Sequence, residues 1–168
     1  MRTRNFLAAA ALALGTVAAP VALTASPASA ACATGAWSST AANRPATLHA
    51  GSTEGVYLWH DGSGWHLRAT HPGTSRTVFT GVIDSSGGIS GVKRALESSD
   101  TVFEATGSRI VFTFKNRGHL DGIDFVVGCS NRITVSASTN GAPIANSNVF
   151  LGSGSVNPTS VPFVLERS

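Results

Sequence analysis

The stretch VYLWHDGSGWHLRAT, residues 56–70, carries a Trp-His pair on each side of four turn-forming residues, Asp61 to Gly64. Runs of branched and aromatic residues around such a turn predict a β-hairpin. A loop of either two or four residues pairs His60 with Trp65, because paired positions in an antiparallel hairpin have a constant sum. The remaining predicted pairs are Trp59 with His66, Leu58 with Leu67, and Tyr57 with Arg68.

Side chains alternate between the two faces of a strand, so this register assigns each hairpin residue to a face. The face expected to enter the core contains Val56, Leu58, His60, Trp65, Leu67 and Ala69. The other face, expected to be partly exposed, contains Tyr57, Trp59, His66, Arg68 and Thr70. A bulge that shifts the register by one would instead bring Tyr57, Trp59, Leu67 and Ala69 to one face.

The second face combines flat rings with hydrogen-bonding groups, which suits a sugar ring that stacks its C–H face on an aromatic side chain. We therefore predict ligand binding by Tyr57, Trp59, His66 and Arg68 in a non-catalytic binding module for carbohydrate or a cell-envelope glycan. Alternatively, Tyr57 and Trp59 pack against another loop. The second functional hypothesis is a structural or inhibitor-like protein-interaction domain.

The rest of the chain has the composition of an all-β protein, with short apolar runs separated by Gly, Asn, Asp, Ser and Pro. In RIVFTFK, residues 109–115, Ile110, Phe112 and Phe114 are predicted to face one way and Val111 and Thr113 the other. Strands are expected at 56–60, 65–70, 77–83, 101–105, 109–115, 123–128, 132–137, 147–151 and 161–166. VKRALE, residues 92–97, suggests either a helix or an irregular strand. A single-domain antiparallel β-sandwich or jelly-roll-like fold follows.

The N-terminus has the pattern of a secretory signal peptide: Arg2 and Arg4, an apolar run, and small residues up to Ala30. We expect a leader at 1–30, an Ala/Ser/Thr-rich, loosely ordered arm at 31–53 and the β-sandwich at 54–168. Cys32 would pin the arm, and Trp37 would pack on the domain. After cleavage, 10 basic and 9 acidic residues remain, with no long run of like charge. A secreted protein is expected, with no nucleic-acid partner and no transmembrane segment.

The chain has two cysteines, Cys32 and Cys129, which would be exposed to an oxidising compartment after secretion. We predict one disulfide between them. A loop of nearly one hundred residues closed in this way stabilises a fold by about 4 to 5 kcal/mol in a chain-entropy model.

No catalytic or metal-binding signature is present, and no cofactor is predicted. The five histidines, His49, His60, His66, His71 and His119, lack metal-site spacing, although a shifted register could bring His60 near His66. His119, Asp121 and Asp124 could together perform acid and base chemistry. A turn at Asp121-Gly122 and an outward Asp124 explain these residues more simply, so a hydrolase is the third hypothesis.

GVYLWHDGSGWHLRATHPG, VFTGVI, ALESSD, RIVFTF, DGIDFVVGCS and PFVLER together resemble a group of small secreted bacterial all-β proteins of actinobacterial type, to which no activity is assigned. The resemblance covers most of the chain after the leader. It implies secretion and a single domain, and it implies nothing about chemistry.

Overall fold

The computed structural model describes residues 35–37, 41–46, 48–49, 53–96, 100–145, 148–155 and 162–168. The predicted leader, 1–30, and parts of the arm lie outside these ranges. Ala31–Ser168 forms one compact unit. Within the described ranges, no helix is long and apolar enough to span a membrane.

Short strands make up nearly all the regular structure of the described residues. They are β1 (Gly55–Asp61), β2 (Gly64–Thr70), β3 (Thr77–Ser85), β4 (Ile89–Ala95), β5 (Thr101–Thr106), β6 (Arg109–Asn116), β7 (Leu120–Val127), β8 (Arg132–Thr139), β9 (Ala142–Pro143), β10 (Val149–Leu151), β11 (Gly154–Ser155) and β12 (Phe163–Glu166).

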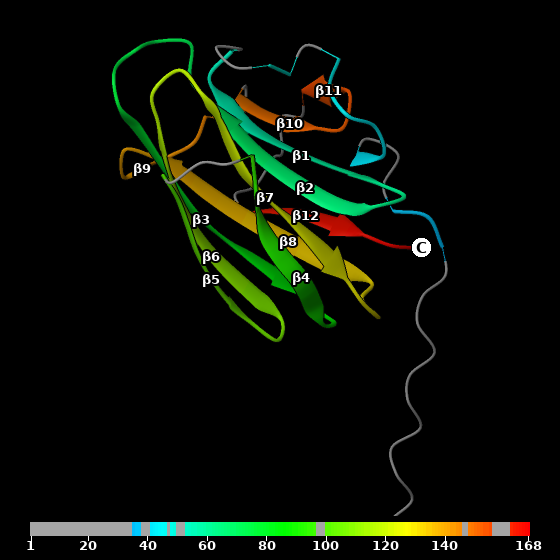
Figure 1. The fold of residues 1–168 in the computed structure, drawn as a ribbon. Helices are drawn as coiled ribbons and strands as arrows, with labels where there is room; N and C mark the ends of the chain where they lie inside the picture. Colours follow the sequence, from blue (N-terminus) through cyan, green and yellow to red (C-terminus); the bar gives the residue numbers. More distant parts are fainter. Residues whose placement is uncertain are drawn as a thin grey trace, which may run out of the picture. The chain divides into compact units, whose positions relative to one another are not determined.

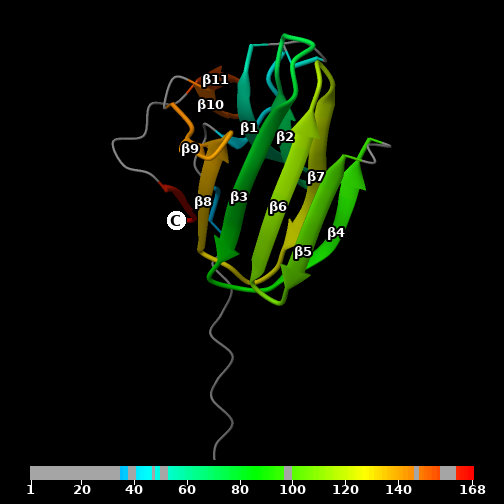
Figure 2. The ribbon, with the colours of Figure 1, turned by 90° about the vertical axis from the view of Figure 1, so that its left-hand side faces the viewer.

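These strands form two sheets that lie in two layers (Figure 1). The hairpin sheet has the order β11-β10-β1-β2-β7-β4. The second sheet has the order β12-β8-β3-β6-β5, with β9 also paired to β8, and Figure 2 shows its outer surface. The predicted all-β sandwich is confirmed.

The core fills the space between the layers with side chains from alternate positions of both sheets. Ile110, Phe112 and Phe114 of β6 are buried, whereas Val111 is exposed, as the alternation in RIVFTFK predicts. The hairpin sheet contributes Val56, Leu58, Trp65, Leu67, Ala69, Ile123, Phe125, Val149 and Leu151.

Two features of the topology differ from the sequence-based expectations. VKRALE belongs largely to β4, whose pairing with β7 shifts between Ser90 and Lys93, so the irregular strand is correct and the helix is wrong. In addition, β10 pairs with β1 in parallel, in an otherwise antiparallel sandwich. Pairing between segments so distant in sequence leaves no local signal, because both orientations use the same alternation.

The described part of the arm packs on the sandwich, and Trp37 lies against the domain as the sequence predicted. Ala41 is fully buried in the core, and Trp37 packs against the same cluster. Trp37 also forms a bridge with Arg167, whose guanidinium donates a hydrogen bond to the Gly35 carbonyl. The arm is thus attached to the residue that follows β12.

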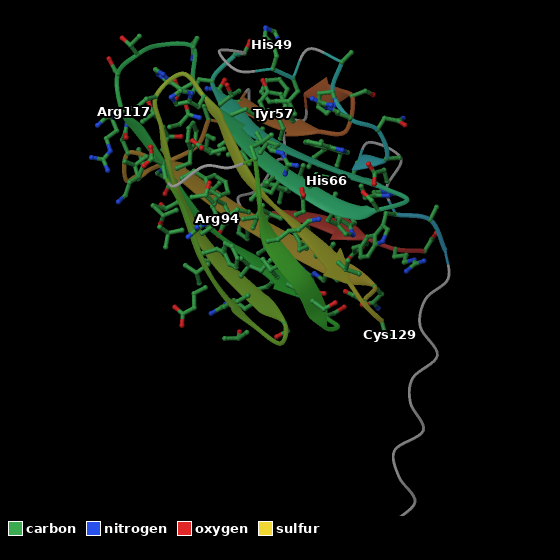
Figure 3. The ribbon with its side chains drawn as sticks, viewed as in Figure 1. His49, Tyr57, His66, Arg94, Arg117 and Cys129 are labelled. Atoms are coloured by element: carbon green, nitrogen blue, oxygen red, sulfur yellow. The ribbon has the colours of Figure 1, made fainter. Side chains whose placement is uncertain are left out.

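Cys129 lies in the connection between β7 and β8 (Figure 3). No cysteine among the described residues is a free thiol. Cys32 lies outside the described residues, so its pairing with Cys129 stays a prediction.

Candidate functional site

The β1–β2 hairpin has the predicted register. Trp59 pairs with His66, His60 with Trp65, and Leu58 with Leu67. The apolar face enters the core as expected, and Trp65 is buried there. Since the register is not shifted, His60 and His66 point to opposite faces of the sheet and cannot share a metal ion.

The other face of the hairpin is not the exposed surface that the sequence suggested. Tyr57 is 2% exposed and Trp59 is 4% exposed, and Arg68 is also buried. Together with Leu48 of the arm, the two aromatic residues form a second apolar cluster, against which Leu120 and Phe150 pack. The prediction of partial exposure is therefore wrong for Tyr57, Trp59 and Arg68, while His66 is partly buried.

The rings of Tyr57 and Trp59 are covered by other side chains, one from β10 and two from the hairpin itself. The ring of Tyr57 stacks on that of Phe150 at a centroid distance of 4.3 Å, and its hydroxyl donates to the Thr53 carbonyl. Burial raises the pKa of Tyr57. The ring of Trp59 stacks on that of His66 at 5.0 Å, and the Arg68 guanidinium lies 5.3 Å from its centroid. Little of either ring is therefore exposed for stacking on a sugar.

His66, which is labelled in Figure 3, joins two carboxylates in a polar network on this face. Its Nδ1 lies 2.9 Å from Asp124 Oδ1, and its Nε2 lies 3.1 Å from Asp61 Oδ1. Arg68 donates to the same Asp124 oxygen at 2.7 Å and also to the carbonyls of Leu67 and Ile123. The guanidinium of Arg68 is thereby held in one orientation.

The network also shifts the pKa values of its members. Burial would raise the pKa of Asp124, but hydrogen bonds from His66 and Arg68 more than offset this and lower it. Hydrogen bonds from the Ser63 hydroxyl and amide, and from His66, hold the pKa of Asp61 well below its usual range. Burial lowers the pKa of Arg68, and the charge of Arg44 adds to that effect, while Asp124 opposes it.

Ser63, His66 and Asp124 have the order of groups found in a Ser-His-Asp triad, which the sequence did not suggest. However, the Ser63 hydroxyl is 3.4 Å from His66 Nε2 and donates instead to Asp61, at 2.6 Å. A carboxylate so close would also repel the oxyanion that acyl transfer requires. This geometry does not activate Ser63 as a nucleophile.

The residues of the earlier hydrolase hypothesis do not converge. Asp121 is buried and accepts a hydrogen bond from Asn116, whereas Asp124 is on the opposite face of β7 beside His66. His119 is exposed. Among the residues that the structure describes, no group of three or more His, Cys, Asp or Glu side chains could hold a metal ion.

Three of the four predicted ligand-binding residues line a small pocket, which we call the arginine pocket. Its volume is about 240 Å³. It is lined by Arg44, Trp59, Asp61, His66, Arg68, Leu96 and Leu120. Tyr57 does not line it. Arg44 comes from the arm, where it donates to the Leu48 carbonyl, and no local pattern connects it with the hairpin.

A larger pocket of about 830 Å³, the tryptophan pocket, lies at the tip of the hairpin. Its described lining includes Trp37, His60, Asp61, Ser63, Trp65 and Arg167. The rings of Trp37 and Trp65 meet edge to face at a centroid distance of 5.2 Å, and Arg167 lies 5.8 Å from the Trp37 centroid. Burial lowers the pKa of His60, although the nearby Asp61 charge opposes this effect.

Fold and site together define a two-sheet β-sandwich with two neighbouring pockets beside one hairpin turn. No family model matches the chain, and no match was found among curated proteins or solved structures.

Proposed function

We propose that this protein is a secreted, non-catalytic binding module for carbohydrate or a cell-envelope glycan, with the tryptophan pocket as its principal site. The observation that carries the proposal is the partly buried Trp37 in the wall of an 830 Å³ pocket. Pockets of this size accommodate small ligands, and indole rings suit the C–H faces of sugars.

The geometry around Trp37 supports a preformed site. Edge-to-face contact with Trp65 and the nearby Arg167 guanidinium restrict the orientation of its ring. A ring that is already ordered loses little conformational entropy when a ligand binds. Trp37 thus replaces Tyr57 and Trp59 as the proposed sugar-stacking residue.

Polar groups around the same pocket can select among sugars. Asp61, Ser63 and Arg167 all line it, and each can form hydrogen bonds with sugar hydroxyls. The contacts of Asp61 with Ser63 and His66 all use Oδ1, and within the described part of the chain Oδ2 has none. Asp61 can therefore accept a hydrogen bond from a ligand without losing its place in the network.

A glycan array, affinity electrophoresis in gels that contain soluble polysaccharides, and pull-down on insoluble polysaccharides test this proposal. We expect the wild-type protein to be retained by at least one glycan, Trp37→Ala to lose retention, and Trp37→Phe to keep part of it. Val111→Thr, on the exposed outer face of the second sheet, is the matched control and should bind normally. Absence of retention on every glycan, or full retention by Trp37→Ala, would contradict the proposal.

One observation favours the alternative of a protein-interaction domain. The outer face of the second sheet has a groove of about 560 Å³ lined by Thr80, Val82, Val111, Thr113 and Ser138 among others. Three valines in strands of the second sheet are exposed, namely Val102, Val111 and Val164. If this face binds a protein, Val111→Lys should abolish that interaction in a pull-down with the purified partner, and glycan retention should not change.

A further inference from the structure

Among the described residues, the two pockets share one lining residue. Asp61, at the end of β1, lines both the arginine pocket and the tryptophan pocket. The hairpin turn therefore separates two adjacent subsites. A ligand longer than one sugar residue could occupy both subsites. Its chain would then run past Asp61, which lies between them.

Two arginines, Arg44 and Arg68, line the arginine pocket, whose volume is about 240 Å³. Arg68 is buried and fixed by Asp124 and two backbone carbonyls, whereas Arg44 is exposed at the surface. The charge of Arg68 is already paired with that of Asp124, at 2.7 Å, whereas Arg44 comes to the same pocket from the arm. An anion in the pocket could accept charge-assisted hydrogen bonds from both residues.

The remaining lining identifies the kind of anion. Asp61 repels any anion, and it repels a doubly charged group such as phosphate more strongly than a single carboxylate, but it can accept hydrogen bonds from hydroxyls. Leu96 and Leu120 add an apolar wall that can contact the C–H groups of a ring. A single carboxylate on a hydroxyl-bearing ring combines these properties.

Leu96 gives independent support for a ligand at this position. Its backbone has φ 63°, in the left-handed region that leucine rarely adopts, and 56% of the residue is exposed. Such backbone strain tends to occur at ligand sites and other functional positions. Here it places an exposed apolar side chain in the wall of the arginine pocket.

We propose that the arginine pocket binds the carboxylate of an acidic sugar residue, so that the ligand is a uronic-acid-type oligosaccharide crossing the hairpin turn. This inference rests on the proposed function, because the neighbouring sugar would occupy the tryptophan pocket. Arg44 and Arg68 hold the carboxylate. Asp61 accepts a hydrogen bond from a hydroxyl of the same sugar or of its neighbour.

The test uses a panel of acidic polysaccharides, polygalacturonate, alginate and hyaluronan among them, each beside its carboxyl-reduced neutral form. We expect the wild-type protein to prefer at least one acidic member over its reduced form by about tenfold or more. Arg44→Gln should lose that preference while keeping a donor for the Leu48 carbonyl. Arg132→Ala, at an exposed position of β8, removes one positive charge elsewhere and should keep the preference.

The outcomes separate this inference from the proposed function. Equal binding to acidic and reduced forms, or an unchanged preference in Arg44→Gln, overturns the acidic subsite even if Trp37→Ala abolishes binding. Equal weakening by Arg44→Gln and Arg132→Ala, or binding to dextran sulfate as strong as to any uronate, would indicate nonspecific charge attraction and also overturn it. If no glycan of either kind is retained, the proposed function itself fails.

Discussion

Trp59 and Trp65 belong to the same repeated Trp-His pattern, and the sequence assigns them to opposite faces of one hairpin. The structure agrees on the faces but buries both rings, because the arm and β10 cover the face that was expected to be exposed. At this scale, side-chain direction follows from the alternation of the strand. Solvent exposure depends on which distant segment lies over that face.

Replacing either tryptophan by alanine should therefore destabilise the domain. We expect Trp59→Ala and Trp65→Ala each to cost about 3 to 5 kcal/mol, the usual range for deleting a large buried aromatic side chain. Urea unfolding followed by circular dichroism measures both changes. Val164→Thr, at an exposed position of β12, is the control and should change stability by less than about 0.5 kcal/mol. A Trp59→Ala protein as stable as wild type would show that the second cluster contributes little.

At the level of elements, the pairing of β2 with β7 brings His66 opposite Asp124 and so builds the polar network. This pairing requires a glycine at position 122. A Cβ atom there would lie 2.1 Å from the Leu67 carbonyl oxygen and 2.6 Å from Arg68 Cδ. The backbone of β7 can approach β2 this closely only without a side chain.

Gly122→Ala should accordingly push β7 away from β2 and cost about 1 to 3 kcal/mol, as overpacking of a tight site does. The matched control is Gly107→Ala, because a Cβ atom at Gly107 would meet no atom within 4 Å. Thermal melts of both variants give the comparison. Equal stability of the two variants would mean that the β2–β7 contact can relax without loss.

Other elements show where local patterns become insufficient. The nine predicted strands all correspond to observed ones, although Ser147 and Val161 lie outside the described residues. The short strands β9 and β11 were missed, since two residues carry no periodicity. For β4, one pattern was compatible with both a helix and a strand, and pairing with β7 decided between them.

For the whole molecule, we predict that oxidation joins Cys32 to Cys129 and ties the arm to the β7–β8 connection. Mass spectrometry of the secreted protein after non-reducing digestion should find the linked peptide. The mass of the intact protein should correspond to a chain that begins at Ala31. Reduction should lower stability by about 2 to 5 kcal/mol. Free thiols at both positions, or a lipid on Cys32, would contradict this prediction.

The sequence by itself determined the all-β class, the hairpin, its register and its core face, because alternation and turn residues act over a few neighbouring positions. It also singled out three residues that line the arginine pocket as candidates for ligand binding, namely Trp59, His66 and Arg68. Only the tertiary structure decided that the aromatic face is covered and that Arg44 and Trp37 take part in the pockets. These outcomes depend on contacts between the arm, the hairpin and the C-terminal strand, whose long separations in sequence leave no periodic signal.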